Sequence, residues 1–257
     1  MTDAEASYLD TAAGRRIAYH RSDGAGPENV PGIVFLGGFI SDMQGTKAVY
    51  LERAAKVRGQ AFLRMDYSGH GASSGVFEEG CISDWAADAV AVIEALAVGP
   101  QILVGSSMGG WIALLIARMM PERVAGLVTI AAAPDFTEDS MWAGMNDIQR
   151  AKLMREGRIF MPSDYDAPYT ITRHLIEDGR QNLVLRDPLE LPFPVRFLQG
   201  TADKDVNMSV ALALLDHASG PDIRLTLVDG ADHRFSDGNC LELIEATLDE
   251  VTARIAG

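Results

Sequence analysis

Residues 102–111 read I-L-V-G-S-S-M-G-G-W, which predicts a buried strand, a tight turn and the start of an apolar helix. The turn carries the pattern G-x-S-x-G, with Gly105, Ser107 and Gly109 at its fixed positions. Small residues two before and two after the serine let strand and helix approach, while the serine hydroxyl is held out above the sheet. We therefore predict Ser107 as a nucleophile, with the neighbouring Ser106 as the alternative.

Short apolar runs alternate with helical patterns on both sides of this stretch. The alternation is typical of βαβ units, so we predict an α/β fold with a mostly parallel central sheet flanked by helices. Strands are expected at residues 15–20 (as an edge strand), 32–36, 61–65, 102–104, 124–132, 194–199 and 224–228. Helices are expected at residues 46–58, from Ser83 or Asp84 (the cap) to about 98, 108–120, 207–217 and 241–255.

The alternation stops between residues 135 and 190. This segment is too long for a connecting loop, so we predict a helical cap (135–190) inserted into a core domain made of residues 1–134 and 191–257. Methionine and aromatic side chains in the segment either pack the cap onto the body or wall an apolar acyl pocket. They are Met141, Trp142, Met145, Met154, Phe160, Met161, Tyr165 and Tyr169.

The 257-residue chain is acidic, with a formal net charge of −14. Such a surface repels phosphate backbones and anionic headgroups, so neither nucleic acid nor a membrane is expected as a partner. Residues 95–117 lack charge, but Gly99, Pro100 and the glycine-rich turn would interrupt a membrane-spanning helix. The start of the chain has no signal-peptide pattern, and Cys81 and Cys240 lack metal-ligand spacing, which favours a reduced, cytoplasmic protein.

Among five histidines, His233 has the position of a general base. It lies in V-D-G-A-D-H-R-F-S, after the last predicted strand and before the last predicted helix. The carboxyl ends of parallel strands meet at one edge of a sheet, which brings His233 to the side of Ser107. A serine needs such a base to take its proton. The other histidines are expected to be structural or solvated: His20, His70, His174 and His217.

A carboxylate is expected to support this histidine. The stretch G-T-A-D-K-D-V follows the strand at 194–199 and offers Asp203 and Asp205. We predict Asp203, because it comes directly after the strand, and expect Asp205 to cap the next helix. Asp135, which follows the strand at 124–132, stays a rival acid, with a helix N-cap or the start of the cap segment as its structural alternative.

Two backbone N–H donors should form an oxyanion hole. Met108 supplies one because it follows the nucleophile, and L-G-G-F-I-S-D supplies the other, with Phe39 as first choice and Ile40 as second. The stretch D-Y-S-G-H-G-A-S-S-G, from Asp66, predicts a turn at the rim of the site. No metal or cofactor is expected, because the histidines form no HxH or HExxH pattern and the glycines accompany no phosphate-binding lysine.

Five stretches together carry a resemblance: G-F-I-S-D-M-Q-G-T-K-A, R-M-D-Y-S-G-H-G-A-S-S-G, G-P-Q-I-L-V-G-S-S-M-G-G-W, G-T-A-D-K-D-V and D-H-R-F-S. From about residue 32 to the last helix, the chain resembles the α/β-hydrolase superfamily, in its branch of palmitoyl-protein thioesterases and acyl-glucuronide esterases with bacterial relatives. The similarity is weakest across the cap. The resemblance implies the α/β-hydrolase fold and a triad of Ser107, Asp203 and His233. No arginine precedes Arg15, unlike a mitochondrial leader.

These observations predict a serine hydrolase that cleaves a carboxylic ester or thioester with an apolar acyl group through an acyl-enzyme. Its partner is a small-molecule or acylated substrate, and the sequence contains no signal for an oligomeric state. One alternative is an amidase or peptidase with the same triad. Another is a non-catalytic binding protein of the same fold, for which a damaged triad would be expected.

Overall fold

The protein, described by a computed structural model over residues 5–26, 30–161 and 169–256, is built around an eight-stranded sheet. Its strand order is β1-β2-β4-β3-β5-β6-β10-β12. The first two neighbouring pairs are antiparallel and the rest are parallel, which confirms the predicted mostly parallel sheet. The strands are β1 (Ser7–Asp10), β2 (Arg16–Ser22), β3 (Ile33–Leu36), β4 (Phe62–Met65), β5 (Gln101–Ser106), β6 (Val124–Ile130), β10 (Val195–Gly200) and β12 (Ile223–Val228).

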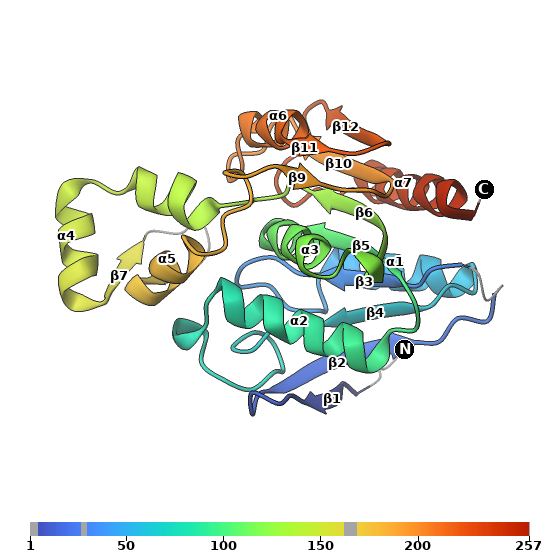
Figure 1. The fold of residues 1–257 in the computed structure, drawn as a ribbon, viewed down its shortest axis with the longest axis horizontal. Coiled ribbons are helices and arrows are strands. Elements are labelled where there is room, and N and C mark those ends of the chain that lie inside the picture. Colours follow the sequence, from blue (N-terminus) through green and yellow to red (C-terminus); the bar gives the residue numbers. More distant parts are fainter. Residues whose placement is uncertain (1–4, 27–29, 162–168, 257) are drawn as a thin grey trace.

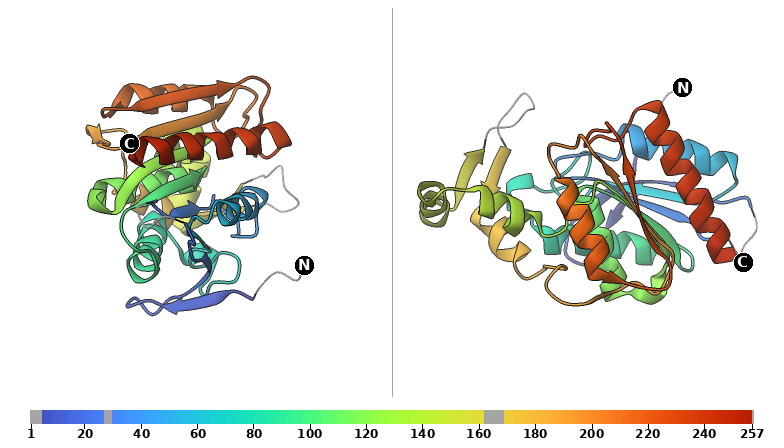
Figure 2. Two further views of the ribbon diagram at one scale, coloured as in Figure 1. Left: turned by 90° about the vertical axis from the view of Figure 1, so that its right-hand side faces the viewer. Right: turned by 90° about the horizontal axis from the view of Figure 1, so that it is seen from above.

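Helices cover both faces of this sheet (Figures 1 and 2). The helices of the body are α1 (Thr46–Val57), α2 (Ile82–Leu96), α3 (Met108–Met119), α6 (Met208–His217) and α7 (Gly238–Ala256), with short 3-10 helices η1 (Phe77–Glu79) and η2 (Pro121–Arg123). Helices α1 and α7 pack on one face, whereas α2, α3 and α6 pack on the other. The flanking helices predicted from the sequence are therefore confirmed.

Alternation along the strands divides the core into two layers. Along β3, Ile33 and Phe35 pack against α1 and α7, whereas Val34 and Leu36 pack against α2 and α3. Successive strand residues point to opposite faces, so a strand covered on both sides reads as a continuous apolar run. This explains why such a run at 32–36 marks a central strand.

The cap segment leaves the body after β6 and lies to one side of the sheet in Figure 1. It contains a π-helix η3 (Thr137–Trp142), α4 (Asp147–Glu156) and α5 (Arg173–Gly179), together with strands β7 (Arg158–Met161) and β8 (Tyr169–Thr172), which pair antiparallel. The strand pair was not predicted, because its four-residue strands carry little apolar alternation. Near the end of the segment, β9 (Leu189–Glu190) pairs with β11 (Ala218–Ser219) of the body.

Three local predictions were wrong. The edge strand is β1, since β2 pairs on both sides, and β1 was missed because its side chains are mostly exposed. Helix α2 begins after Cys81 without a side-chain cap; Ser83 and Asp84 instead bind Asp178 and Arg15. Helix α6 is capped by Asn207, whose side chain accepts from the Ser209 N–H, and not by Asp205. No helix in the described ranges is long and apolar enough to cross a membrane.

Candidate active site

Ser107 occupies a strained turn between β5 and α3. Its backbone has φ 56° and ψ −119°, a region that residues other than glycine rarely adopt. A Cβ added at Gly105 would lie 2.3 Å from the Gly109 carbonyl oxygen, and one added at Gly109 would lie 2.0 Å from the Leu36 carbonyl oxygen. Backbone atoms cannot give way at those distances. The two glycines are therefore required for the serine to stand at the carboxyl edge of the sheet.

The three predicted triad side chains lie together although they are far apart in the chain. His233 Nε2 is 3.1 Å from Ser107 Oγ, and His233 Nδ1 is 2.9 Å from Asp203 Oδ2. Ser107 follows β5, Asp203 follows β10 and His233 follows β12, so the three residues come from the carboxyl ends of parallel strands. This geometry allows the imidazole to take a proton from the hydroxyl while the carboxylate holds Nδ1–H.

Asp203 is held as an ionised carboxylate. Burial of its side chain raises the pKa, but hydrogen bonds from His233 and from the Val206 N–H outweigh burial, and the pKa lies below the usual range of a carboxyl. Asp205 N–H and the Gln199 side chain also donate to it, at 2.9 and 3.0 Å. A negative charge facing Nδ1 would stabilise an imidazolium if His233 took up a proton.

The loop that carries His233 is tied to α1 by a contact that the sequence did not reveal. Lys47 Nζ donates to the Arg234 carbonyl oxygen, and burial lowers the pKa of Lys47 to about 8. Phe235 has a positive φ of 49°, and its N–H donates to Asp232 Oδ1 at 3.1 Å. The contact between Lys47 and Arg234 joins residues 187 positions apart, so no local sequence pattern could have indicated it.

The rival residues have other partners. Asp135 is fully buried at the base of the cap, where its carboxylate accepts from the Val184 and Leu185 N–H groups at 2.8 and 3.0 Å. Burial raises its pKa more than these donors lower it. Asp205 is exposed, and Ser106 is buried as the last residue of β5. Among the residues that the structure describes, neither Asp135 nor Asp205 forms a hydrogen bond or ion pair with His233.

The other four histidines lie outside this constellation. His20 is buried beside Gln44, and His217 binds the Asp187 carbonyl oxygen. His174 is exposed on α5. His70 is buried within the D-Y-S-G-H-G turn, which Asp66 organises by accepting from the Met43 and Ala72 N–H groups at 2.6 and 2.8 Å. These histidines therefore have the structural or solvated positions that were predicted.

The loop after β3 runs directly against the nucleophile. A Cβ added at Gly38 would lie 3.3 Å from Ser107 Cβ, so the backbone beside Phe39 approaches the Ser107 side chain. The Ile40 N–H donates to His70 Nε2 at 3.3 Å. Met108 is the first residue of α3, where backbone N–H groups have no acceptor within the helix. This arrangement favours Phe39 over Ile40 as the second oxyanion donor, because the Ile40 N–H has another partner.

Aromatic rings from body and cap meet around Phe39. Its ring centroid lies 5.0 Å from that of Phe77, 5.5 Å from Phe136 and 6.2 Å from Tyr169. Met145, in contrast, is buried in a small core of the cap with Leu153, Ile159, Ile171 and Ile176. The cap residues therefore divide: Met145 packs the cap itself, whereas Phe136 and Tyr169 reach Phe39. Tyr165 lies outside the described residues.

Within the described part of the chain, two groups of side chains have ligand atoms close enough to hold a metal ion, within 4.8 Å of one another. One is Cys81, Asp84 and His174, and the other is Asp203, Asp205 and His233. In the second group the Asp203 and His233 atoms already bind each other. The histidine tautomer that serves Ser107 requires that bond, so this group fits a proton-transfer pair better than a metal centre.

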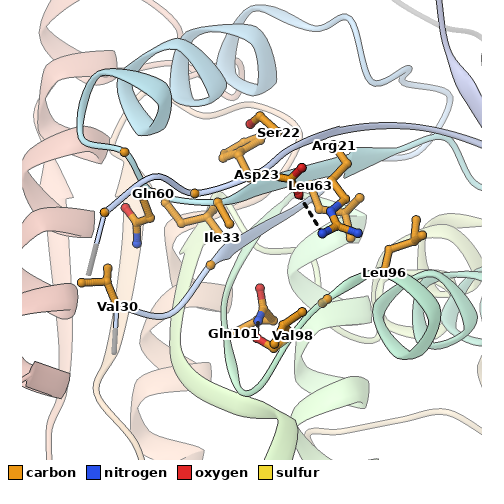
Figure 3. A pocket seen from close by; sticks show the side chains of 17 residues that line it. Arg21, Ser22, Asp23, Val30, Ile33, Gln60, Leu63, Leu96, Val98 and Gln101 are labelled. Atoms are coloured by element: carbon orange, nitrogen blue, oxygen red, sulfur yellow. Dashed lines mark hydrogen bonds and ion pairs between the residues drawn. The ribbon is translucent and has the colours of Figure 1, made fainter. Parts of the chain in front are cut away.

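A pocket of about 500 Å³ lies at the opposite edge of the sheet (Figure 3). It is lined at the amino ends of the parallel strands, by Ile33, Phe62 and Gln101 among others. Arg21 and Asp23 form an ion pair at its wall, with N and O 2.7 Å apart. Because Ser107, Asp203 and His233 follow the carboxyl ends of the strands, this pocket is separate from their site.

Comparison with known proteins assigns this chain to a family that agrees with its fold. The model of the alpha/beta hydrolase family matches residues 33–246, which is most of the chain. The chain belongs to the alpha/beta hydrolase family. It is therefore a hydrolase, in agreement with the sequence prediction.

Relatives within this hydrolase family span nearly the whole chain. The mitochondrial palmitoyl-protein thioesterase ABHD10 of Rattus norvegicus is 34% identical over 242 residues, 93% of this chain and 80% of the rat protein. A solved structure from Agrobacterium vitis S4 has a TM-score of 0.92 and 38% identity, covering 96% of this hydrolase and 98% of that chain. The mouse alpha/beta hydrolase domain-containing protein 10 has a TM-score of 0.89 and 32% identity, covering 98% and 100%. The resemblance inferred from the motifs is confirmed.

Proposed function

We propose that this hydrolase cleaves a carboxylic ester or thioester through an acyl-enzyme formed on Ser107. The observation that carries the proposal is the pair of contacts of His233, one to Ser107 Oγ at 3.1 Å and one to Asp203 Oδ2 at 2.9 Å. A non-catalytic protein of this fold has no need for a strained serine backbone aligned with a histidine and a buried carboxylate. Strain of this kind is retained at sites where it serves function.

In the proposed reaction, Ser107 Oγ attacks the carbonyl carbon while His233 Nε2 takes the hydroxyl proton. The tetrahedral intermediate collapses as the imidazolium gives this proton to the leaving alcohol or thiol, and the acyl group stays on Ser107. Water then attacks the acyl-enzyme and gives a proton to His233. Collapse of the second intermediate returns the proton to Ser107 and releases the carboxylic acid.

The Met108 and Phe39 N–H groups are proposed to hold the oxyanion. The N-terminus of α3 supplies the Met108 N–H, and the loop after β3 supplies the Phe39 N–H next to the Gly38 backbone. Hydrogen bonds to the charge that develops on the carbonyl oxygen contribute more in the transition state than in the ground state. No cofactor is needed for these steps.

We propose an apolar acyl group, bound near Phe39 and Phe136. Two observations support this class of substrate: the ring cluster that joins body and cap around Phe39, and the relation to enzymes named palmitoyl-protein thioesterases. We also propose a cytoplasmic location, on the acidic charge and the two free, buried cysteines, which cell fractionation tests.

A fluorophosphonate probe and a substrate panel test the reaction class. We expect the probe to label Ser107, as read by mass spectrometry of the peptide, and to leave Ser107→Ala unlabelled. Wild-type enzyme should then hydrolyse p-nitrophenyl esters and acyl thioesters faster than the matching amides. A lack of labelling would support a binding protein, and a preference for aminoacyl amides would support a peptidase.

The acyl-chain profile tests the proposed pocket. Each buried CH₂ contributes about 0.8 kcal/mol, so kcat/KM should rise by about threefold to fourfold per methylene until the pocket is full. Phe136→Ala should shift the preferred chain length in a series from two to sixteen carbons. Met145→Ala is the matched control: it should lower the melting temperature without moving the profile, because Met145 packs the cap core. Activity that peaks at acetyl esters would overturn the proposal.

A further inference from the structure

His70 is a buried histidine that the proposed reaction does not use. Only 4% of its surface is exposed, and its ring meets Tyr67, Phe77 and Trp85 edge-on, at centroid distances of 5.6, 5.1 and 5.1 Å. It belongs to the D-Y-S-G-H-G turn between β4 and η1, which is a different segment from the loop that carries Phe39. A polar ring in an aromatic surrounding needs defined partners for both nitrogens.

Both partners of His70 are backbone groups, and together they define its tautomer. The Ser68 carbonyl oxygen lies 3.2 Å from Nδ1 and can only accept, so Nδ1 carries the proton. The Ile40 N–H lies 3.3 Å from Nε2 and can only donate, so Nε2 must be unprotonated. Only the neutral ring satisfies both bonds.

The bond to Ile40 acts on the loop that approaches Ser107. Ile40 has φ 55°, an unfavourable region for a β-branched residue, and 54% of its surface is exposed. Packing of the Ile40 side chain therefore contributes little to holding this conformation. The peptide plane after Phe39 is held through its N–H, and His70 is the acceptor.

We propose that His70 is a positioning residue, which holds the Phe39–Ile40 peptide so that the Phe39 N–H faces the oxyanion, and which releases this peptide when its ring is protonated. The inference rests on the proposed function, because it gives Phe39 the role of oxyanion donor. Protonated His70 would point an Nε2–H at the Ile40 N–H, and two donors repel each other. The oxyanion hole would then lose its geometry while Ser107, Asp203 and His233 stay in place.

The surroundings keep His70 neutral near pH 7. Burial lowers its pKa more than the Ser68 carbonyl and Asp88 raise it, so the pKa lies below 6.5. Asp88, on α2, is the carboxylate that faces the ring, and it already accepts from Arg15 at 2.6 Å and from the Ser68 N–H at 2.9 Å. Burial raises the pKa of Tyr67, which keeps its hydroxyl neutral, and the carboxylates of η1 are exposed.

The sign of the pH dependence follows from this lowered pKa. The unfolded chain takes up the proton first as pH falls through about 6.5, so folding loses stability from there down to the folded pKa. In the folded enzyme the ring is protonated, and the peptide after Phe39 released, only as pH falls through the folded pKa, at the lower end of this range. Acid should therefore lower kcat through protonation of His70, at a pH below the ordinary pKa of a histidine.

Two substitutions distinguish a positioning role of His70 from a role in which its ring only fills space among the surrounding aromatic rings. His70→Gln can place an acceptor oxygen at the Nε2 position and does not titrate, whereas His70→Phe fills the volume without an acceptor. At pH 7.5 we expect His70→Phe to lose about tenfold to hundredfold in kcat, with KM changed by less than about threefold. His70→Gln should keep kcat within about threefold and should lose activity less steeply than wild type between pH 6.5 and 5. Equal losses in both folded variants, or unchanged kcat in His70→Phe, would overturn the proposal.

Two further measurements distinguish a failure of the His70 proposal from a failure of the proposed function. Labelling of Ser107 by fluorophosphonate in wild-type enzyme reports the proposed function by itself. The ¹⁵N shifts of the His70 ring report its tautomer without any turnover: a proton on Nδ1 at pH 7 is expected, and a proton on Nε2 would overturn the proposal. If His70→Phe does not fold, the pH profile of His70→Gln against wild type still decides.

Discussion

Replacing Ser107 with alanine should lower kcat by about four to six powers of ten and leave the fold intact. In the proposed reaction Ser107 Oγ is the atom that forms the acyl-enzyme, and no other group replaces it. The proposed oxyanion donors and the binding site survive and should give a weak residual rate. Stopped-flow or discontinuous assays of a p-nitrophenyl ester, with protein titrated by active-site labelling, measure the loss. The melting temperature should change little, because the hydrogen bonds that hold the turn use the Ser107 backbone, which alanine keeps.

Ser106→Ala is the matched control for this experiment. Ser106 is the adjacent hydroxyl, buried as the last residue of β5, whereas the Ser107 hydroxyl faces His233. We expect Ser106→Ala to retain kcat within about threefold, because the Ser106 hydroxyl takes no part in the proposed reaction. Loss of this small buried side chain should lower stability and not activity. If Ser106→Ala were inactive and Ser107→Ala active, the assignment of the nucleophile would be wrong.

Asp203→Asn should lower kcat by about 10⁴. Asparagine keeps the shape of the side chain but can present an amide N–H to His233 Nδ1, which favours the tautomer that cannot accept from Ser107. The pH–rate profile and kcat of the variant measure the effect, and KM should change far less. The backbone donors of Asp205 and Val206 still find one oxygen on asparagine, so the variant should fold.

Asn variants at the two rival positions give the controls. Asp205→Asn alters an exposed side chain and should change neither kcat nor stability. Asp135→Asn should destabilise the fold by about 1–3 kcal/mol, because one of the Val184 and Leu185 N–H groups would lose its acceptor in a buried site. Its kcat per folded molecule should stay within about tenfold of wild type. The assignment of Asp203 fails if its Asn variant retains more activity than either of these two.

The motif at residues 102–111 was sufficient to predict the strand, the turn and the helix around Ser107 because its requirement is local. Gly105 and Gly109 are needed where backbone atoms approach to 2.3 and 2.0 Å of a Cβ position, and only glycine meets that need. The apolar runs were also sufficient to predict the central strands, because a strand that is covered on both faces has no polar residue to interrupt the run. The order of the sheet's parallel strands then explains why residues after β5, β10 and β12 reach one edge.

Other features depend on contacts between segments that are far apart in the sequence, and they could not be predicted. The β7–β8 pair lies in a segment whose short strands have weak alternation. At the start of α2, the Ser83 N–H donates to Asp178 and the Asp84 carboxylate accepts from Arg15, so neither residue acts as the predicted cap. The contact of Lys47 with the loop of His233 has the same origin.

The sequence by itself was sufficient to predict the fold class, the turn at Ser107 and the chain order of the three proposed triad residues, because each follows from steric or periodic requirements of neighbouring residues. Only the tertiary structure shows that the Ile40 N–H donates to His70, which favours Phe39 over Ile40 as the proposed oxyanion donor. The acceptor of the Ile40 N–H is the ring of His70, which lies in a turn 30 residues further along the chain. A hydrogen bond between separate loops depends on how both pack against α2, and no local pattern encodes that packing.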